Sequence, residues 1–402
     1  MVGMKMCVYF TMPLVIFKTL SLMGVYMGTL EMINLGSLNG SLILLTGMFT
    51  MLAIKPILSS SSPLIMSLLI FFHGVAFLTS DMLMVLIISD VMICWITLGF
   101  GLNHTSMKEL TSNMYLVYYV MIPSTPLLMM VLSEYFKGKS TSLISYYGMD
   151  SLITFSGVGV GFLILLSGLA KLPVFGLHYW LPKAHVQAPT ILSMILAGLS
   201  LKIGLFVTSF VMINTSMPIA VITNIVAVLL VGMLVSTYTG TSATDSKVFL
   251  AYCSVSHMTG GCIGVGLMAI LSFKGAWLIG LGHCLSSPLL FYIAGNTQYG
   301  TGSRVLLPSK GIKLGWAGII LLMLLLMDLP FPPTFSFWGE VTLLTTLHCM
   351  YSLLSCFMII SLVVLLRGYE QMFTNMRGYM CTSVMAGFIG SVLTLILGVM
   401  LI

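Results

Sequence analysis

The chain has 402 residues, of which 58% are hydrophobic and only 6% are charged, with a formal net charge of +6 at pH 7. Soluble domains carry a charge on roughly a quarter of their residues, so this sequence cannot cover a water-facing surface. The composition excludes a soluble dinucleotide enzyme, a nucleic-acid-binding protein, a secreted disulfide scaffold and a disordered chain, and it indicates a polytopic membrane protein.

Apolar runs long enough to cross a bilayer follow one another along the chain. A helix needs roughly 20 residues to span the hydrocarbon core, and about thirteen runs approach or exceed that length. They fall near residues 7–33, 38–55, 62–80, 81–103, 112–136, 151–180, 189–212, 217–240, 248–271, 275–296, 312–342, 345–367 and 380–402. No polar connection is long enough to form a soluble domain. We therefore predict that residues 1–402 form a single transmembrane domain of the all-α class.

Two of these runs are too long for one straight crossing. Residues 151–180 contain Pro173, and residues 312–342 contain the segment LPFPP. Proline removes a backbone donor and clashes with the preceding turn, so both runs predict broken or kinked helices. Backbone groups freed by a break must face protein or water, which favours a hydrated cavity near the second break.

The basic residues between the runs predict the orientation of the chain. When successive runs alternate in direction, most loop Lys and Arg residues share one side, and only Lys137, Lys139 and Lys274 fall on the other. Positive charge collects on the side from which a chain is inserted, so the N-terminus is expected to face the cytoplasm or matrix. The first run lacks an obvious cleavage site, and the 34 Met fit a mitochondrial genetic code. We expect a protein made inside an organelle.

Lysines inside the apolar runs are the first candidates for function. A charge at mid-membrane costs about 2.5–3.5 kcal/mol on translocon scales, so it faces a polar cavity, pairs with an opposite charge or carries protons. Lys171 and Lys202 lie well inside consecutive runs, whereas Lys18 can snorkel to the headgroups. Burial disfavours a charged amine and a nearby carboxylate favours it, so movement of that partner would switch proton binding. Two permanent structural ion pairs are the alternative.

Histidines occur in the same part of the chain. His178 follows Lys171 by about two helical turns, so the two side chains share a face if the helix continues past Pro173. His257 and His283 lie in the middle of later runs. Histidine relays protons near neutral pH, but each of these residues could equally pack through hydrogen bonds.

Carboxylates complete the set of buried ionisable residues. Asp90 is deep in its run, whereas Asp81 is expected at the lipid boundary, and Glu340 follows the proline-rich break. Asp328 precedes that break and either caps the free backbone or lies on the same path; we favour the structural role. His and acid residues show no metal-ligand spacing within a run, and the eight Cys include no CxxC pair, so no metal site is predicted.

A long segment on either side of Lys183 carries a family resemblance. KLPVFGLHYWLPKAHVQAPTILSMILAGLSLKIG, residues 171–204, closely resembles the signature of the antiporter-like subunits of respiratory complex I. Supporting segments follow in the family's order: DSKVFLAYCSVSHM (245–258), GHCLSSPLLFYIAGNTQYGTGSR (282–304) and LPFPPTFSFWGEVTLL (329–344). The resemblance implies an antiporter-like core over residues 81–402 and a weakly matched region with shortened spans over residues 1–80.

The resemblance also implies a proton pathway through named residues. It makes Lys171 the lysine of the broken helix and Lys202 the lysine of the central axis. Asp90 takes the place of a glutamate that pairs with the first lysine, and its shorter side chain leaves open a direct contact or one through water. Gln187 replaces a glutamate, which removes one charge. The implied pathway residues are Asp90, Lys171, His178, Lys202, His257, His283 and Glu340.

The function implied by the resemblance is proton translocation across the mitochondrial inner membrane. It is coupled to electron transfer from NADH to ubiquinone in other subunits, so the chain would be a non-redox subunit of an enzyme. NADH, FMN, iron–sulfur clusters and ubiquinone would belong to those other subunits, and this chain would bind no cofactor. Expected partners are other membrane subunits, including the antiporter-like chains 2 and 5, and membrane lipids. A stand-alone cation/proton antiporter and a structural membrane scaffold are the alternatives.

Overall fold

The computed structural model describes residues 63–79, 81–103, 107–138, 158–214, 218–301, 316–328 and 334–347. The predicted runs at 7–33, 38–55 and 380–402, and nearly all of 345–367, lie outside these ranges, as does Lys18. Within the described ranges most residues are helical, and six helical segments are long and apolar enough to cross a membrane. The expectation of an all-α polytopic fold is confirmed.

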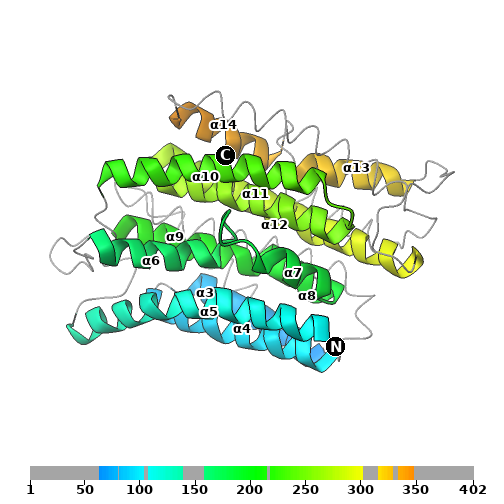
Figure 1. Ribbon diagram of the computed structural model, residues 1–402, viewed down its shortest axis with the longest axis horizontal. Helices are drawn as coiled ribbons and strands as arrows, with labels where there is room; N and C mark the ends of the chain where they lie inside the picture. Colours follow the sequence, from blue (N-terminus) through cyan, green and yellow to red (C-terminus); the bar gives the residue numbers. More distant parts are fainter. Residues whose placement is uncertain are drawn as a thin grey trace.

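Three helices lie side by side along one edge of the bundle (Figure 1). They are α3 (Pro63–Leu78), α4 (Met82–Asn103) and α5 (Met107–Phe136). Only 28% of the most apolar stretch of α5 is buried, so most of this helix faces the outside of the bundle.

The first broken helix follows next along the chain. Helix α6 (Val158–Lys171) ends at Lys171, turns occupy most of the following residues, and α7 (Trp180–Gln187) then begins. Pro173 cannot donate a helical hydrogen bond, and Gly176 adopts a φ of +97°, which is in the left-handed region that favours glycine. The break predicted for residues 151–180 is therefore confirmed, and it places Lys171 at the end of a half-helix.

The next span is continuous but contains a wider turn. It consists of α8 (Thr190–Ile195), the π-helical segment η4 (Leu196–Ser200) and α9 (Leu201–Asn214). Lys202 lies directly after the π-helical segment, a type of irregularity that is frequent at functional sites. Helix α9 approaches the end of α6 closely, because a Cβ added at Gly204 would lie 3.0 Å from the carbonyl oxygen of Lys171.

Three long helices form the centre and one flank of the bundle. They are α10 (Ile219–Thr241), α11 (Ser246–Gly266) and α12 (Ile270–Thr301). The most apolar stretches of α12 and α11 are 94% and 83% buried, whereas the corresponding stretch of α10 is only 33% buried. The polar side chains of α11 and α12 therefore face other protein elements, whereas α10 is peripheral.

The second broken helix consists of α13 (Trp316–Asp328) and α14 (Phe335–Thr346). Thr334 caps α14, because its hydroxyl accepts a hydrogen bond from the backbone N–H of Phe337 at 3.3 Å. Helix α14 touches the backbone of α12: a Cβ added at Gly339 would lie 2.8 Å from the carbonyl oxygen of Gly275. This close approach fixes the position of the next residue, Glu340.

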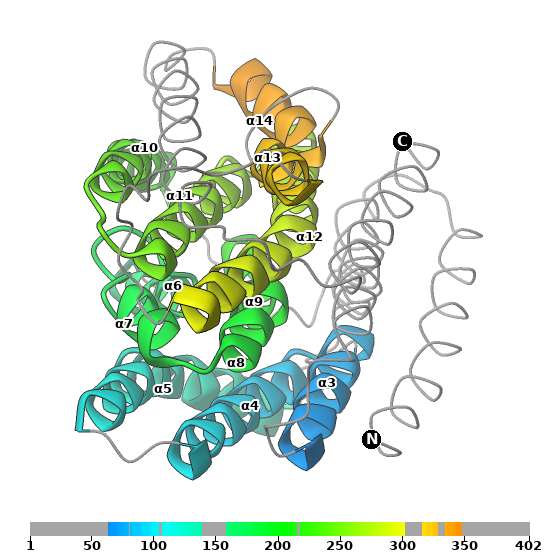
Figure 2. The same cartoon turned by 90° about the vertical axis from the view of Figure 1, so that its right-hand side faces the viewer.

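The elements are stacked in the order that the chain follows. Figures 1 and 2 show α3–α5 along one edge, α6–α9 above them, α10–α12 next and α13 with α14 along the opposite edge. The first broken helix therefore lies in the layer next to α3–α5, and the second lies along the opposite edge (Figures 1 and 2).

Candidate functional site

Lys171 and Asp90 form a direct ion pair. Lys171 Nζ lies 3.0 Å from Asp90 Oδ1, and the side chains are 5% and 16% exposed. Lys171 Nζ also donates to the hydroxyl of Ser89 at 2.5 Å, and Ser124 on α5 donates to Asp90 Oδ2 at 3.2 Å. Of the two arrangements left open by the sequence, the shorter acid side chain thus makes the direct contact.

A cavity adjoins this ion pair. It encloses about 460 Å³ of non-atom space, part of which is open to the outside, and Ser89, Lys171, Trp180 and Ser200 are polar residues among its mostly apolar lining. The indole N–H of Trp180 is buried and has no hydrogen-bond partner within the described ranges. The cavity thus connects Lys171 with the π-helical segment that precedes Lys202.

Lys202 is fully buried on α9. Its ammonium donates to the carbonyl oxygen of Ala197 at 2.6 Å and lies 2.7 Å from Nδ1 of His283 on α12. Among the described residues no carboxylate lies within ion-pair distance of Lys202 Nζ. At 2.7 Å a proton can sit on the amine or on the imidazole nitrogen, so this contact can exchange a proton without rearranging the backbone.

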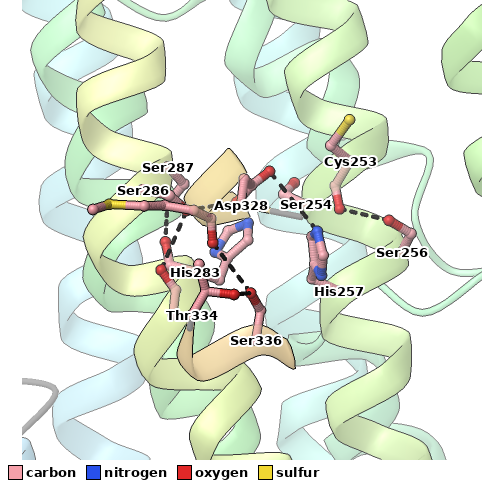
Figure 3. A network of polar contacts seen from close by, with 12 residues as sticks. Cys253, Ser254, Ser256, His257, His283, Ser286, Ser287, Asp328, Thr334 and Ser336 are labelled. Atoms are coloured by element: carbon pink, nitrogen blue, oxygen red, sulfur yellow. Dashed lines mark hydrogen bonds and ion pairs between the residues drawn. The ribbon is translucent and has the colours of Figure 1, made fainter. Parts of the chain in front are cut away.

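Two histidines continue from Lys202 into the second broken helix. The rings of His283 and His257 have their centroids 5.8 Å apart. His257 Nε2 lies 3.8 Å from Asp328 Oδ2, and His257 Nδ1 lies 3.9 Å from Glu340 Oε1. Each ring nitrogen of His257 therefore faces a different acid. Figure 3 shows Asp328 between His257 on one side and Ser286 on the other.

The break between α13 and α14 positions the two acids. Asp328 is the last residue of α13, and Ser336 in the first turn of α14 donates to the carbonyl oxygen of Met327 at 3.1 Å. The hydroxyls of Thr334 and Ser336 lie 3.0 Å apart (Figure 3). These contacts join the ends of the two half-helices. Glu340 is 3% exposed, and its Oε2 has no hydrogen-bond partner in the described part of the chain.

These side chains form one buried polar row across the bundle. We use that name for Asp90, Lys171, Lys202, His283, His257, Asp328 and Glu340. Its members are 8% exposed or less by side chain, apart from Asp90 at 16%. Within the described ranges no group of three or more His, Cys, Asp or Glu residues is arranged to hold a metal ion. The Lys202–His283 contact is short enough for direct proton transfer, whereas the 3.8 and 3.9 Å separations at His257 require a bridging water or a small side-chain movement.

His178 does not join the buried polar row. Its ring stacks against Phe175 and Tyr179, with centroids 5.0 and 4.6 Å away, and its Nδ1 accepts a hydrogen bond from the backbone N–H of Gly176. His178 would share a helical face with Lys171 only if the helix continued past Pro173, and this condition is not met, because α6 ends at Lys171. No hydrogen bond or ion pair within the described ranges links His178 to the row.

Two further buried ionisable residues lie in the row or on the neighbouring α7. The sequence favours a backbone-capping role for Asp328, and in the structure its side chain contacts Ser286 and His257. His185 on α7 is fully buried, its ring stacks on Phe291 at 4.4 Å, and neither ring nitrogen has a hydrogen-bond partner within the described ranges. The sequence does single out Asp328 as a buried charge, since an acid before a proline break costs as much free energy in an apolar run as an acid after it.

The family described as NADH:quinone oxidoreductase/Mrp antiporter, TM, matches residues 79–367. NADH-ubiquinone oxidoreductase chain 4 of Struthio camelus is 31% identical over 249 residues, which cover 60% of this chain and 54% of that protein. Chain 4 of Branchiostoma lanceolatum is 29% identical over 334 residues, covering 75% and 71%. The match to the first of these relatives thus spans about half of its length.

The fold also has a counterpart among solved structures. A chain of respiratory complex I from Thermus thermophilus with bound NADH superimposes with a TM-score of 0.74, at 20% sequence identity, covering 90% of this chain and 79% of that one. At this identity the likeness concerns the fold alone.

Proposed function

Because the chain belongs to the NADH:quinone oxidoreductase/Mrp antiporter transmembrane family, we propose that it is a proton-translocating membrane subunit of a respiratory NADH:ubiquinone oxidoreductase, of the chain 4 type. It is a multi-pass membrane protein. The proposal places it in the mitochondrial inner membrane, where proton transfer is coupled to electron transfer in other subunits. We propose residues 81–402 as its antiporter-like core.

One observation carries the proposal: Lys202 is fully buried and in contact with a titratable imidazole rather than with an acid. A lysine buried for structure alone is normally locked to a carboxylate, since an uncompensated charge in the interior is costly. Lys202 Nζ contacts His283 Nδ1 at 2.7 Å instead. That arrangement favours a lysine that binds and releases a proton over one that is held permanently charged.

The proposed path uses the buried polar row from end to end. Asp90 stabilises the charged form of Lys171, and separation of this pair would release a proton into the cavity lined by Trp180 and Ser200. Lys202 would take up that proton and exchange it with His283 at 2.7 Å. His257 would then carry it toward the acids of the second broken helix. His178 lies beside this path and is proposed to position the turn that ends at α7.

The remaining parts of the reaction are assigned to other chains. We propose that NADH, FMN, the iron–sulfur clusters and ubiquinone are bound by other subunits, and that this chain binds no cofactor. Its partners would be further membrane subunits, among them antiporter-like chains 2 and 5, and lipids. The supporting observation is that the two relatives described above are named as chain 4 of this oxidoreductase.

The decisive experiment uses the native assembly. Detergent extraction and purification should recover this chain with a large NADH-oxidising complex, which pumps protons when reconstituted into vesicles. Lys202→Met keeps the volume and removes the charge, so it should assemble and lose proton pumping. Lys183→Met is the matched control, since Lys183 is an exposed residue over the ring of Tyr115 and should leave pumping unchanged.

Two outcomes would contradict the proposal. A stand-alone antiporter would exchange Na⁺ for protons when this chain alone is placed in vesicles, which a subunit of the oxidoreductase should not do. Intact proton pumping in Lys202→Met would instead indicate a membrane scaffold.

A further inference from the structure

His257 is flanked by two carboxylates on its two ring nitrogens. Asp328 Oδ2 lies 3.8 Å from Nε2, and Glu340 Oε1 lies 3.9 Å from Nδ1. The acids come from opposite sides of the break between α13 and α14, and both are buried. With a bridging water or a small movement of either side chain to close these gaps, the imidazole can accept a proton at one nitrogen while it donates from the other. The proposed function takes the proton from His257 toward both acids but gives Asp328 no role of its own.

The surroundings of Asp328 accommodate both of its protonation states. Its Oδ1 accepts a hydrogen bond from the hydroxyl of Ser286 at 2.5 Å. The same hydroxyl lies 3.2 Å from the carbonyl oxygen of Gly282, which is an alternative acceptor. When Asp328 binds a proton, it can donate to the Ser286 oxygen while Ser286 turns its own hydrogen toward Gly282. No polar group is left unpaired by the change.

The charge of Asp328 also acts on the rest of the row. Asp328 is close enough for electrostatic interaction with Lys202, His257 and Glu340. Two carboxylates that flank one imidazole repel each other when both are ionised.

We propose that Asp328 is a second proton-carrying acid of this chain and that His257 transfers protons between Asp328 and Glu340. The inference rests on the proposed function. In the transfer, the proton on Asp328 bonds to His257 Nε2 while the proton on Nδ1 leaves for Glu340. One proton leaves the first acid, one arrives at the second, and the imidazole ends in the other tautomer. The reverse sequence carries a proton the other way.

The test compares three variants in the reconstituted native assembly. Asp328→Asn keeps an oxygen that can accept from Ser286 but cannot carry a proton, so proton translocation per NADH oxidised should fall by about tenfold or more. Asp328→Glu should retain most of it. Asp81→Asn is the control, because the same change at the start of α4, where asparagine also caps a helix well, should have no effect.

Infrared difference spectra recorded on reduction by NADH supply a readout that a structural role would not move. The band of a protonated carboxyl should be lost in Asp328→Asn and shifted in Asp328→Glu. Full translocation in the asparagine variant, or an unshifted carboxyl band in the glutamate variant, would overturn the inference and leave the proposed function standing. If the asparagine variant fails to assemble, the band of the glutamate variant decides. Absence of NADH-driven translocation in the unaltered assembly would instead overturn the proposed function.

Discussion

Replacing Asp90 with asparagine should destabilise the contact between α4 and α6 more than removing both charges of the pair. At the observed 3.0 Å between Nζ and Oδ1, the Coulomb attraction is about 5 kcal/mol for an effective dielectric constant of 20. Desolvation offsets much of that attraction in the intact pair, but the loss of one partner leaves the other charge buried and uncompensated. Such a loss costs about 3–5 kcal/mol.

The local geometry places Asp90→Asn at the lower end of that range. An asparagine oxygen can still accept from Lys171, the Ser89 hydroxyl remains at 2.5 Å, and the Asp90 side chain is 16% exposed. In the double variant Asp90→Asn/Lys171→Met no charge is left, so most of the cost should be recovered. The two substitutions should therefore couple strongly in a double-mutant cycle.

Hydrogen exchange of the α4 and α6 amides measures the free energy of local opening without unfolding the whole assembly. The control is Lys137→Met, which removes the 62%-exposed lysine of the Glu134 pair and should change the opening of α5 by less than about 1 kcal/mol. Equal loss of protection in Asp90→Asn and in the double variant would refute the reasoning, since the cost would then owe nothing to an uncompensated lysine.

Two further predictions concern α14. Gly339→Ala should impair assembly and proton translocation, because the added Cβ would lie 2.6 Å from Ile279 Cγ1 and displace Glu340. Gly260→Ala is the control, since its Cβ would make ordinary contacts with the Met233 sulfur at 3.4 Å and with Ile279 Cδ1 at 3.8 Å. Wild-type translocation in Gly339→Ala would contradict this. Thr334→Ala removes the hydroxyl that caps α14, so it should reduce amide protection at the start of α14 by about 1 kcal/mol, whereas Thr334→Ser keeps the hydroxyl and should not. Equal amide protection in the two variants would exclude a capping role for Thr334.

The helices and their breaks could be predicted from the sequence because their causes are local. Apolar length predicts each crossing, and the runs expected at 189–212 and 217–240 correspond to helical segments ending at Asn214 and Thr241. The proline chemistry that ends α6 acts within one turn of Pro173. Such features need no knowledge of which helix packs against which.

The side-chain partners could not be predicted in the same way. Whether the carboxylate of Asp90 reaches Lys171 depends on the separation of two backbones, which neither residue type specifies. The position of His178 depends on the path of the turn after Lys171, and a break of unknown direction removes the helical register that would have placed it. Composition identifies costly residues, but only packing decides which of them meet.

The ionisable residues of the row coincide with irregular backbone, and helix electrostatics explains why. Lys171 ends α6, where the unpaired carbonyl groups of a helix C-terminus stabilise a cation, and Lys202 bonds a carbonyl of the π-helical segment. Asp328 also occupies a helix C-terminus, but there the same carbonyl groups offer an anion no stabilisation. Its remaining support comes from Ser286 and from nearby positive charge. A carboxylate placed against the helix dipole therefore depends on its side-chain contacts with Ser286 and His257 for compensation.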